Sequence, residues 1–112
     1  MGVNQIQRTV QQRSFEFALS VIRLYKKLQA RQEFILSPQL LRSGTSIGIH
    51  VEEAMAQPNS ADRVQQMAIA SKNARETHYW LKLLQESKLV DVDVSPELEQ
   101  IEDLLRLLTD LA

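Results

Sequence analysis

The chain has 112 residues, which is the usual size of one domain and leaves no room for a cofactor domain beside a substrate domain. Hydrophobic residues make up 44% and charged residues 24%, a globular balance that argues against intrinsic disorder, and the lack of cysteine excludes a disulfide scaffold and a cysteine nucleophile. The net charge of −1 gives no overall attraction to polyanions, and no apolar run is long enough to cross a bilayer. We therefore expect one cytoplasmic domain, residues 1–112, with no export signal and no membrane association.

The charges are unevenly distributed along the chain. Residues 1–50 carry seven basic and two acidic residues, whereas residues 51–112 carry six basic and twelve acidic residues. Two interpretations stay open: the basic half attracts the acidic half or a neighbouring subunit, which is the default, or it faces a polyanion.

Few glycines and prolines interrupt the chain, and they divide it into four segments that each predict a helix. The first helix, about residues 7–30, has an apolar stripe at spacings of three and four: Phe17, Val21, Leu24 and Leu28. The second, about residues 38–57, starts where Ser37 can cap the free amides and Pro38 takes the first helical position.

The third helix is expected over residues 61–87, with Ser60 as its cap. Residues 88–94 alternate apolar and polar side chains like a strand, but no second strand pattern exists to pair with them, so we predict a loop. Ser95 and the proline after it open a fourth helix over residues 96–111. The sequence thus predicts an all-α fold.

The apolar residues of the last two helices are spread over about half of the circumference, which is wider than the stripe that one core needs. On the second helix, Ile49 points away from the apolar stripe. A monomer would expose some of this surface, so we expect self-association through surfaces that include the third and fourth helices. The alternative is that a short bundle buries wide faces.

The second helix also contains a run of small residues from Ser43 to Gly48. Each glycine inside a helix costs about 0.8–1 kcal/mol relative to alanine, so close packing must offset the cost. We interpret Gly44 and Gly48 as positions where a neighbouring backbone, or a large side chain such as Trp80, comes near. A phosphate-binding loop is disfavoured because no strand precedes the run and no Gly-Lys-Ser/Thr follows.

Catalytic chemistry has little support in the residues. The serines occupy predicted caps and the small-residue run, and no nucleophile, base and oxyanion site can be assembled. His50, Glu53 and His78 suggest a metal site, but the Glu-x-x-His pairs of di-iron bundles are missing, and His78 is better explained as a core or interface histidine. We predict a protein that is not an enzyme and has no cofactor; a metal-dependent enzyme is the alternative.

A small basic patch is predicted on the outer side of the first two helices, formed by Arg8, Arg23, Lys26, Lys27 and Arg42. Such a patch would contact phosphates, which gives affinity without reading a base sequence. One protomer offers few charges, but a ring of protomers would multiply them.

Several segments carry a family resemblance: residues 39–48 (QLLRSGTSIG), Glu53-Ala54, residues 67–70 (MAIA) and residues 76–84 (ETHYWLKLL). They resemble the bacterial four-helix bundle protein family encoded within intervening sequences of large-subunit ribosomal RNA genes. The resemblance covers residues 39–85 most strongly and implies an up-down-up-down bundle that assembles as a homopentamer. It extends to accessory proteins of diversity-generating retroelements, which bind nucleic acid and a reverse transcriptase. The resemblance implies no catalytic residues. Among the basic positions of this chain, it implies an RNA contact only for Arg42.

The sequence therefore predicts a cytoplasmic, non-enzymatic ring of four-helix bundles, a pentamer, that binds RNA or a ribonucleoprotein and has a nucleic-acid-processing protein as a possible partner. The alternative is a protein–protein adaptor or structural oligomer with no nucleic-acid role, in which the basic first helix pairs with the acidic fourth helix.

Overall fold

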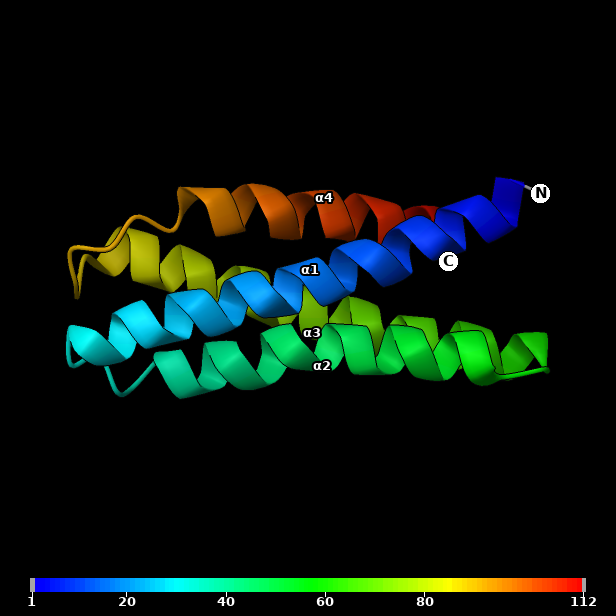
Figure 1. The fold of residues 1–112 in the computed structure, drawn as a ribbon, viewed down its shortest axis with the longest axis horizontal. Helices are drawn as coiled ribbons and strands as arrows, with labels where there is room; N and C mark the ends of the chain where they lie inside the picture. The colour runs from blue at the N-terminus through cyan, green and yellow to red at the C-terminus, as the bar shows by residue number, and fades with distance from the viewer. Residues whose placement is uncertain (1, 112) are drawn as a thin grey trace.

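The computed structural model describes residues 2–111, with side chains from Gln5 onward, and within that range it contains four α-helices and no strand. They are α1 (Gly2–Ala30), α2 (Ser37–Ala56), α3 (Ser60–Ser87) and α4 (Ser95–Leu111). The helices run alternately up and down along a body of 44 × 19 × 18 Å (Figure 1). The predicted all-α four-helix bundle is confirmed.

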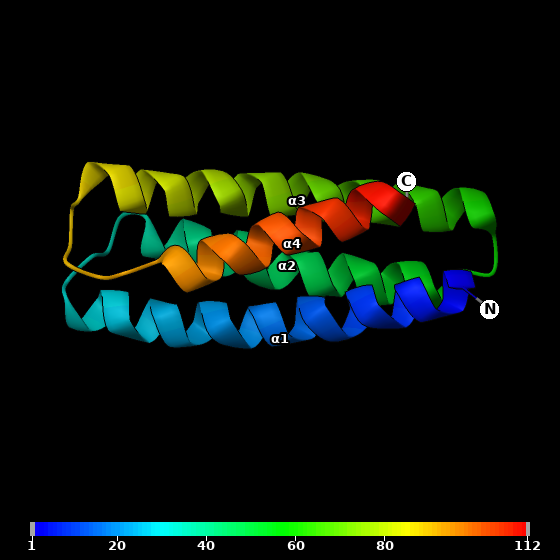
Figure 2. The same cartoon turned by 90° about the horizontal axis from the view of Figure 1, so that it is seen from above.

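The four helices form a closed square. α1 packs against α2 and α4, and α3 packs against the same two helices, whereas the backbones of the diagonal pairs stay further apart among residues 2–111. Seen from above, α1 and α3 form opposite sides of the body, and α4 lies over α2 (Figure 2). Hence each helix has two packed flanks and one outer face.

The helix starts differ from the sequence-based bounds in an informative way. α2, α3 and α4 each begin one residue earlier than predicted, at the serine that was expected to cap, and α1 begins at Gly2 instead of near Gln7. The Asn59 side chain caps α3 by accepting a hydrogen bond from the Ala61 amide at 2.8 Å. The predicted cap at Ser60 was therefore wrong, because an asparagine one residue earlier reaches the free amides first.

The start of α2 is held by Glu33, which the sequence analysis did not single out. Its buried carboxylate accepts hydrogen bonds from the amides of Ile35, Leu36 and Ser37 at 3.0, 2.9 and 2.7 Å. The Ser37 hydroxyl instead donates to the Glu33 carbonyl oxygen at 2.7 Å, so the prediction that Ser37 caps the helix was wrong. Burial alone would raise the pKa of Glu33, but the backbone amides and the Ser37 hydroxyl together lower it.

The apolar side chains of α4 are buried in the core or pack against it. Four side chains of α4 are buried: Leu98, Ile101, Leu104 and Leu108. Three further leucines are partly buried and pack against the core: Leu105, Leu107 and Leu111. α1 and α3 cover both flanks of α4, and its three partly buried leucines keep some exposed surface. Self-association through surfaces that include α3 and α4 stays a prediction. Among residues 2–111, none of the four helices contains an apolar stretch that could span a bilayer.

Candidate nucleic-acid interface

The five predicted basic residues are all exposed, but they do not form one patch. Arg23, Lys26 and Lys27 lie within little more than one turn at the C-terminal end of α1. Arg8 lies about 22 Å away along the same helix, because fifteen residues separate it from Arg23. Arg42 projects from α2 and hydrogen-bonds Gln39 of its own helix. The structure therefore gives a basic cluster of three residues at the end of α1, with Arg8 apart from it along the same helix and Arg42 on the neighbouring helix.

The cluster is positioned by the buried stripe of α1. Val21, Leu24 and Leu28 are at most 1% exposed, which fixes the rotation of the helix and turns Arg23 and Lys26 toward solvent. No carboxylate pairs with either side chain among the described residues. Both cations are thus available to an external anion.

Lys27 has a different environment, because it is turned toward α4. Burial raises the pKa of Glu97, and the positive charge of Lys27 opposes that rise only in part. One Glu97 oxygen, Oε1, is buried and has no hydrogen-bond partner. Lys27 therefore serves partly as a countercharge within the chain.

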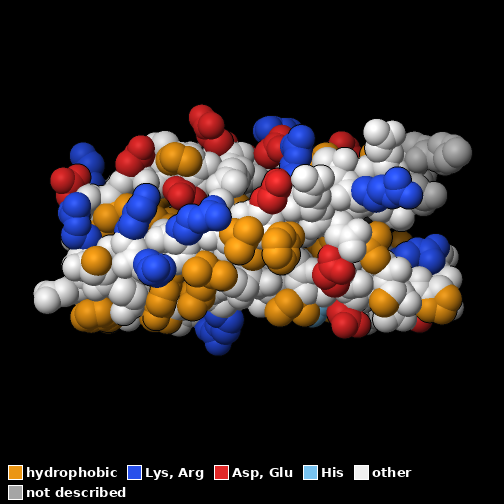
Figure 3. Space-filling view, in the orientation of Figure 1, with side chains coloured by type: hydrophobic (Ala, Val, Ile, Leu, Met, Phe, Trp, Pro, Cys, Tyr) orange, Lys and Arg blue, Asp and Glu red, His pale blue; other side chains and the backbone are white. Residues whose placement is uncertain are grey.

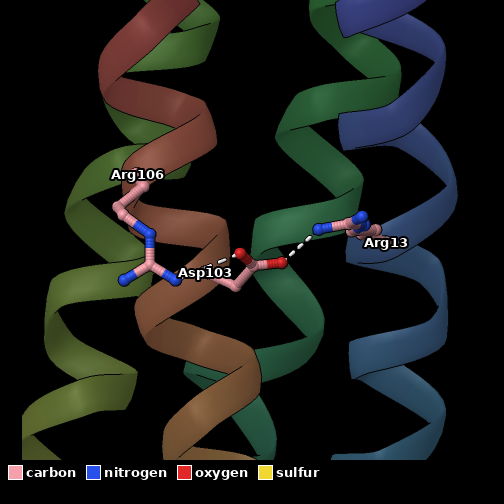
Figure 4. A network of polar contacts seen from close by, with 3 residues as sticks. All are labelled: Arg13, Asp103 and Arg106. Carbon is pink, nitrogen blue, oxygen red and sulfur yellow. Dashed lines mark hydrogen bonds and ion pairs between the residues drawn. The ribbon is translucent and has the colours of Figure 1, made fainter.

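The proposed pairing between the basic first helix and the acidic fourth helix occurs, but through another residue. Arg13 forms an ion pair with Asp103, which also accepts a hydrogen bond from Arg106 at 3.2 Å (Figure 4). Arg13 was not among the predicted site residues. The α1–α4 contact thus neutralises Arg13 and leaves Arg23 and Lys26 unpaired in the described chain.

The two helix glycines face α1, and their nearest neighbours do not include Trp80. A Cβ on Gly44 would lie 2.8 Å from Val21 Cγ2, so close packing against α1 requires the glycine. A Cβ on Gly48 would meet nothing nearer than the Ser14 carbonyl oxygen at 3.6 Å, which is ordinary contact. Trp80 lies on α3, packs on the core and meets the exposed Tyr79 ring edge-on, with 5.5 Å between ring centroids. Packing within the chain explains Gly44 and does not explain Gly48.

Gly48 instead lies in a groove of about 470 Å³ between α1 and α2. Small residues line it beside Gly48, namely Ser14, Ala18 and Thr45, and the walls include the exposed side chains of Phe15 and Ile49. Hydrophobic side chains gather over α1 and α2 around the middle of this face (Figure 3).

The apolar part of this face was missed in the sequence, apart from Ile49. Phe15, Leu19 and Ile22 are 64%, 37% and 42% exposed and lie on the outer side of α1. Their spacing of four and three residues was the available signal, but the stronger inner stripe of the same helix concealed it.

The histidines do not meet. His50 Nδ1 lies 2.9 Å from Gln66 Oε1 between α2 and α3, whereas His78 Nε2 lies 3.3 Å from Glu102 Oε2 between α3 and α4. The trio of His50, Glu53 and His78 is not brought together, and no group of three metal-ligating side chains occurs within the residues that were described.

Comparison with known proteins identifies the fold and the family. Residues 7–110 match the family described as 23S rRNA-intervening sequence protein. A similar solved structure is the crystal structure of a protein with unknown function from the S23 ribosomal protein family of Bacteroides thetaiotaomicron VPI-5482. It is 35% identical with a TM-score of 0.89, and the match covers 95% of this chain and 96% of that chain. No curated protein matches the chain.

Proposed function

Because the chain belongs to the 23S rRNA-intervening sequence protein family, we propose that it is a non-enzymatic, homo-oligomeric scaffold that binds RNA through the basic end of α1. The observation that carries the proposal is the pair of exposed cations, Arg23 and Lys26, which have no carboxylate partner among the described residues. Lys27 adds a third positive charge to the same turn of the helix.

The proposed assembly strengthens a weak site. Two or three phosphate contacts in one copy give little affinity at physiological salt. In a ring, such as the pentamer that the family resemblance implies, rotation places the same end of every copy on the same side. The basic clusters would then act together on one RNA, and a nucleic-acid-processing protein would be a further partner of the scaffold.

The proposal is tested by reversing the charges of the two lysines. We expect Lys26→Glu/Lys27→Glu to weaken RNA binding and to reduce the slope of log affinity against log salt by about 1.4 for each copy that contacts a single strand. The matched control is Lys72→Glu/Arg75→Glu on α3, which makes the same change in net charge at exposed positions outside the cluster. Equal losses in both variants would show that only net charge matters, and the proposed site would be wrong.

A second candidate function is a protein–protein adaptor with no nucleic-acid role. The exposed apolar side chains of Phe15, Leu19 and Ile22 favour it, because such a patch suits a protein partner better than a phosphate backbone. Absence of RNA binding by the wild-type chain at low salt would favour this function.

A further inference from the structure

The turn between α1 and α2 presents two large apolar side chains to solvent. Phe34 and Ile35 are 56% and 76% exposed, although they follow directly on the buried Glu33. The turn lies at the end of the bundle where α1 ends and α2 begins (Figure 1). The basic cluster of Arg23, Lys26 and Lys27 occupies the last turns of α1, so an exposed phenyl ring lies at the same end as the cations of the proposed RNA site.

Hydrogen bonds hold the turn, so the exposure of Phe34 is built into the fold. The Glu33 amide donates to the Leu28 carbonyl oxygen at 2.9 Å, and the Glu33 carboxylate accepts a hydrogen bond from the Ile35 amide at 3.0 Å. Phe34 thus lies between two residues whose backbone is held. The Glu33 carboxylate is buried and does not face the solvent beside the ring. A ring on a rigid turn loses little conformational freedom when a ligand stacks on it.

Cations from two helices lie at similar distances from the turn. α1 ends at Ala30, which is four residues, or about 6 Å along the axis, beyond Lys26. On α2, Arg42 lies five residues, or about 7.5 Å, from the start of the helix at Ser37. Both cations are exposed, and neither has a carboxylate partner among the described residues. A polyanion can therefore contact both helices beside the turn.

The apolar surface at this end is too small for a protein partner. In the described chain it consists of Phe34, Ile35 and Leu89, whose loop is held by a hydrogen bond from Arg31 to the Asp91 carbonyl oxygen at 3.0 Å. A standard protein interface takes about 20–30 residues from each side. A nucleobase needs only one ring, and single strands are commonly bound by an aromatic side chain that stacks on a base beside basic residues.

The acidic residues at this end favour a nucleic-acid strand over an anionic membrane. Asp91 and Asp93 are exposed on the loop between α3 and α4, which lies apart from the turn between α1 and α2 (Figure 1). A flat anionic surface that covered the whole end would meet both carboxylates and be repelled. A strand on the α1–α2 side would pass Lys26 and Arg42 and avoid them.

We propose that the RNA bound at this end is single-stranded, with one unpaired base stacked on Phe34 and neighbouring phosphates on Lys26 and Arg42. This proposal rests on the proposed function and names the class of RNA that the site takes. The faces of bases inside a duplex are covered by the neighbouring pairs, so Phe34 can stack only on an unpaired base. The cations hold the backbone of either form, and the ring gives the site its preference for single strands.

The experiment measures fluorescence anisotropy of a short single-stranded RNA of mixed sequence and of the duplex that contains it, with the full chain at several salt concentrations. Phe34→Leu keeps an apolar side chain and removes the ring, so we expect single-strand binding at least about fivefold weaker at every salt concentration. The slope of log affinity against log salt should not change, because no charge is removed. Duplex binding should also stay unchanged, and Phe34→Tyr, which keeps the ring, should bind like the wild type.

The matched control is Tyr79→Leu, which removes a ring of nearly the same exposure, 58%, from α3. It should bind both RNAs like the wild type. Phe34→Trp gives a direct readout, because Trp80 is the single tryptophan of the chain. Fluorescence quenching by the single strand that occurs in Phe34→Trp and not in the wild type would report a base on the new ring. Circular dichroism of each variant checks that the fold is retained.

Three results would overturn the proposal: Phe34→Leu binding the single strand like the wild type, an equal loss in Tyr79→Leu, or equal losses for single strand and duplex. Vesicles containing phosphatidylserine that bind the wild type and not Phe34→Leu, with RNA binding unchanged, would assign this end to a membrane instead.

Failure of the proposed function looks different from failure of the stacked base. If Lys26→Glu/Lys27→Glu weakens RNA binding and lowers the salt slope while Phe34→Leu has no effect, the basic site stands and only the stacked base is wrong. If the wild type binds no RNA at low salt, the proposed function is wrong and the stacked base is wrong with it.

Discussion

Replacing Gly44 by alanine tests whether the close approach of α2 to α1 is as tight as the structure indicates. The new Cβ would lie 2.8 Å from Cγ2 and 3.1 Å from Cγ1 of Val21, which is fully buried. Valine in a helix strongly prefers one rotamer, so the side chain cannot turn away without strain. Overpacking of this kind costs about 1–3 kcal/mol, and the gain in helix propensity returns about 1 kcal/mol. We expect Gly44→Ala to lower the free energy of unfolding by up to about 2 kcal/mol.

Gly48→Ala is the matched comparison, because it makes the same chemical change one turn further along α2. Its Cβ would meet only ordinary contacts at 3.6–3.8 Å, so the helix gains about 0.8–1 kcal/mol without a clash. Urea unfolding of the two variants should therefore differ by about 1–3 kcal/mol, with Gly48→Ala the more stable.

A double-mutant cycle identifies the cause. A Val21→Ala background removes the contacts at 2.8 and 3.1 Å and leaves only the Cβ of residue 21 at 3.3 Å, so Gly44→Ala should be much less destabilising there. If Gly44→Ala is as stable as Gly48→Ala in the wild-type background, or if Val21→Ala does not change its effect, the packing argument is refuted.

Two carboxyl groups give the remaining predictions. Glu33 has a lowered pKa in the folded chain, so its stabilisation is present above the ordinary value of 4.5 and is lost as the pH falls through the lowered value. Glu33→Gln should lower the free energy of unfolding by about 1–3 kcal/mol at pH 7, with a smaller difference in acid, as measured by urea unfolding against pH. Glu97 has a raised pKa in the folded chain, so stability is lost as the pH rises from the ordinary value of 4.5 to the raised value. Glu97→Gln should therefore stabilise the chain at pH 7 and have no effect below pH 4.5. A Glu97→Gln variant that is less stable than the wild type at pH 7 would show that Lys27 compensates the buried charge.

The helices were predictable because their signals are local. An apolar stripe with helical spacing and a proline at a first turn each depend on residues a few positions apart. The cap of α2 was not predictable in the same way, since Glu33 reaches the amides only after the turn from α1 has folded. The wrong cap at Ser37 follows from applying a local rule where a residue of the preceding turn competes.

The surface features were harder to predict than the helices, because they depend on the order and rotation of the helices in the bundle. Outward cations could be placed from the inner stripe, but the pairing of Arg13 with Asp103 joins positions 90 residues apart. The partner of Gly44 likewise required the rotation of α2, which turns the glycine toward Val21. The spacing of Phe15, Leu19 and Ile22 was present in the sequence, and only the burial of the inner stripe of α1 shows that these three side chains lie on the outer side.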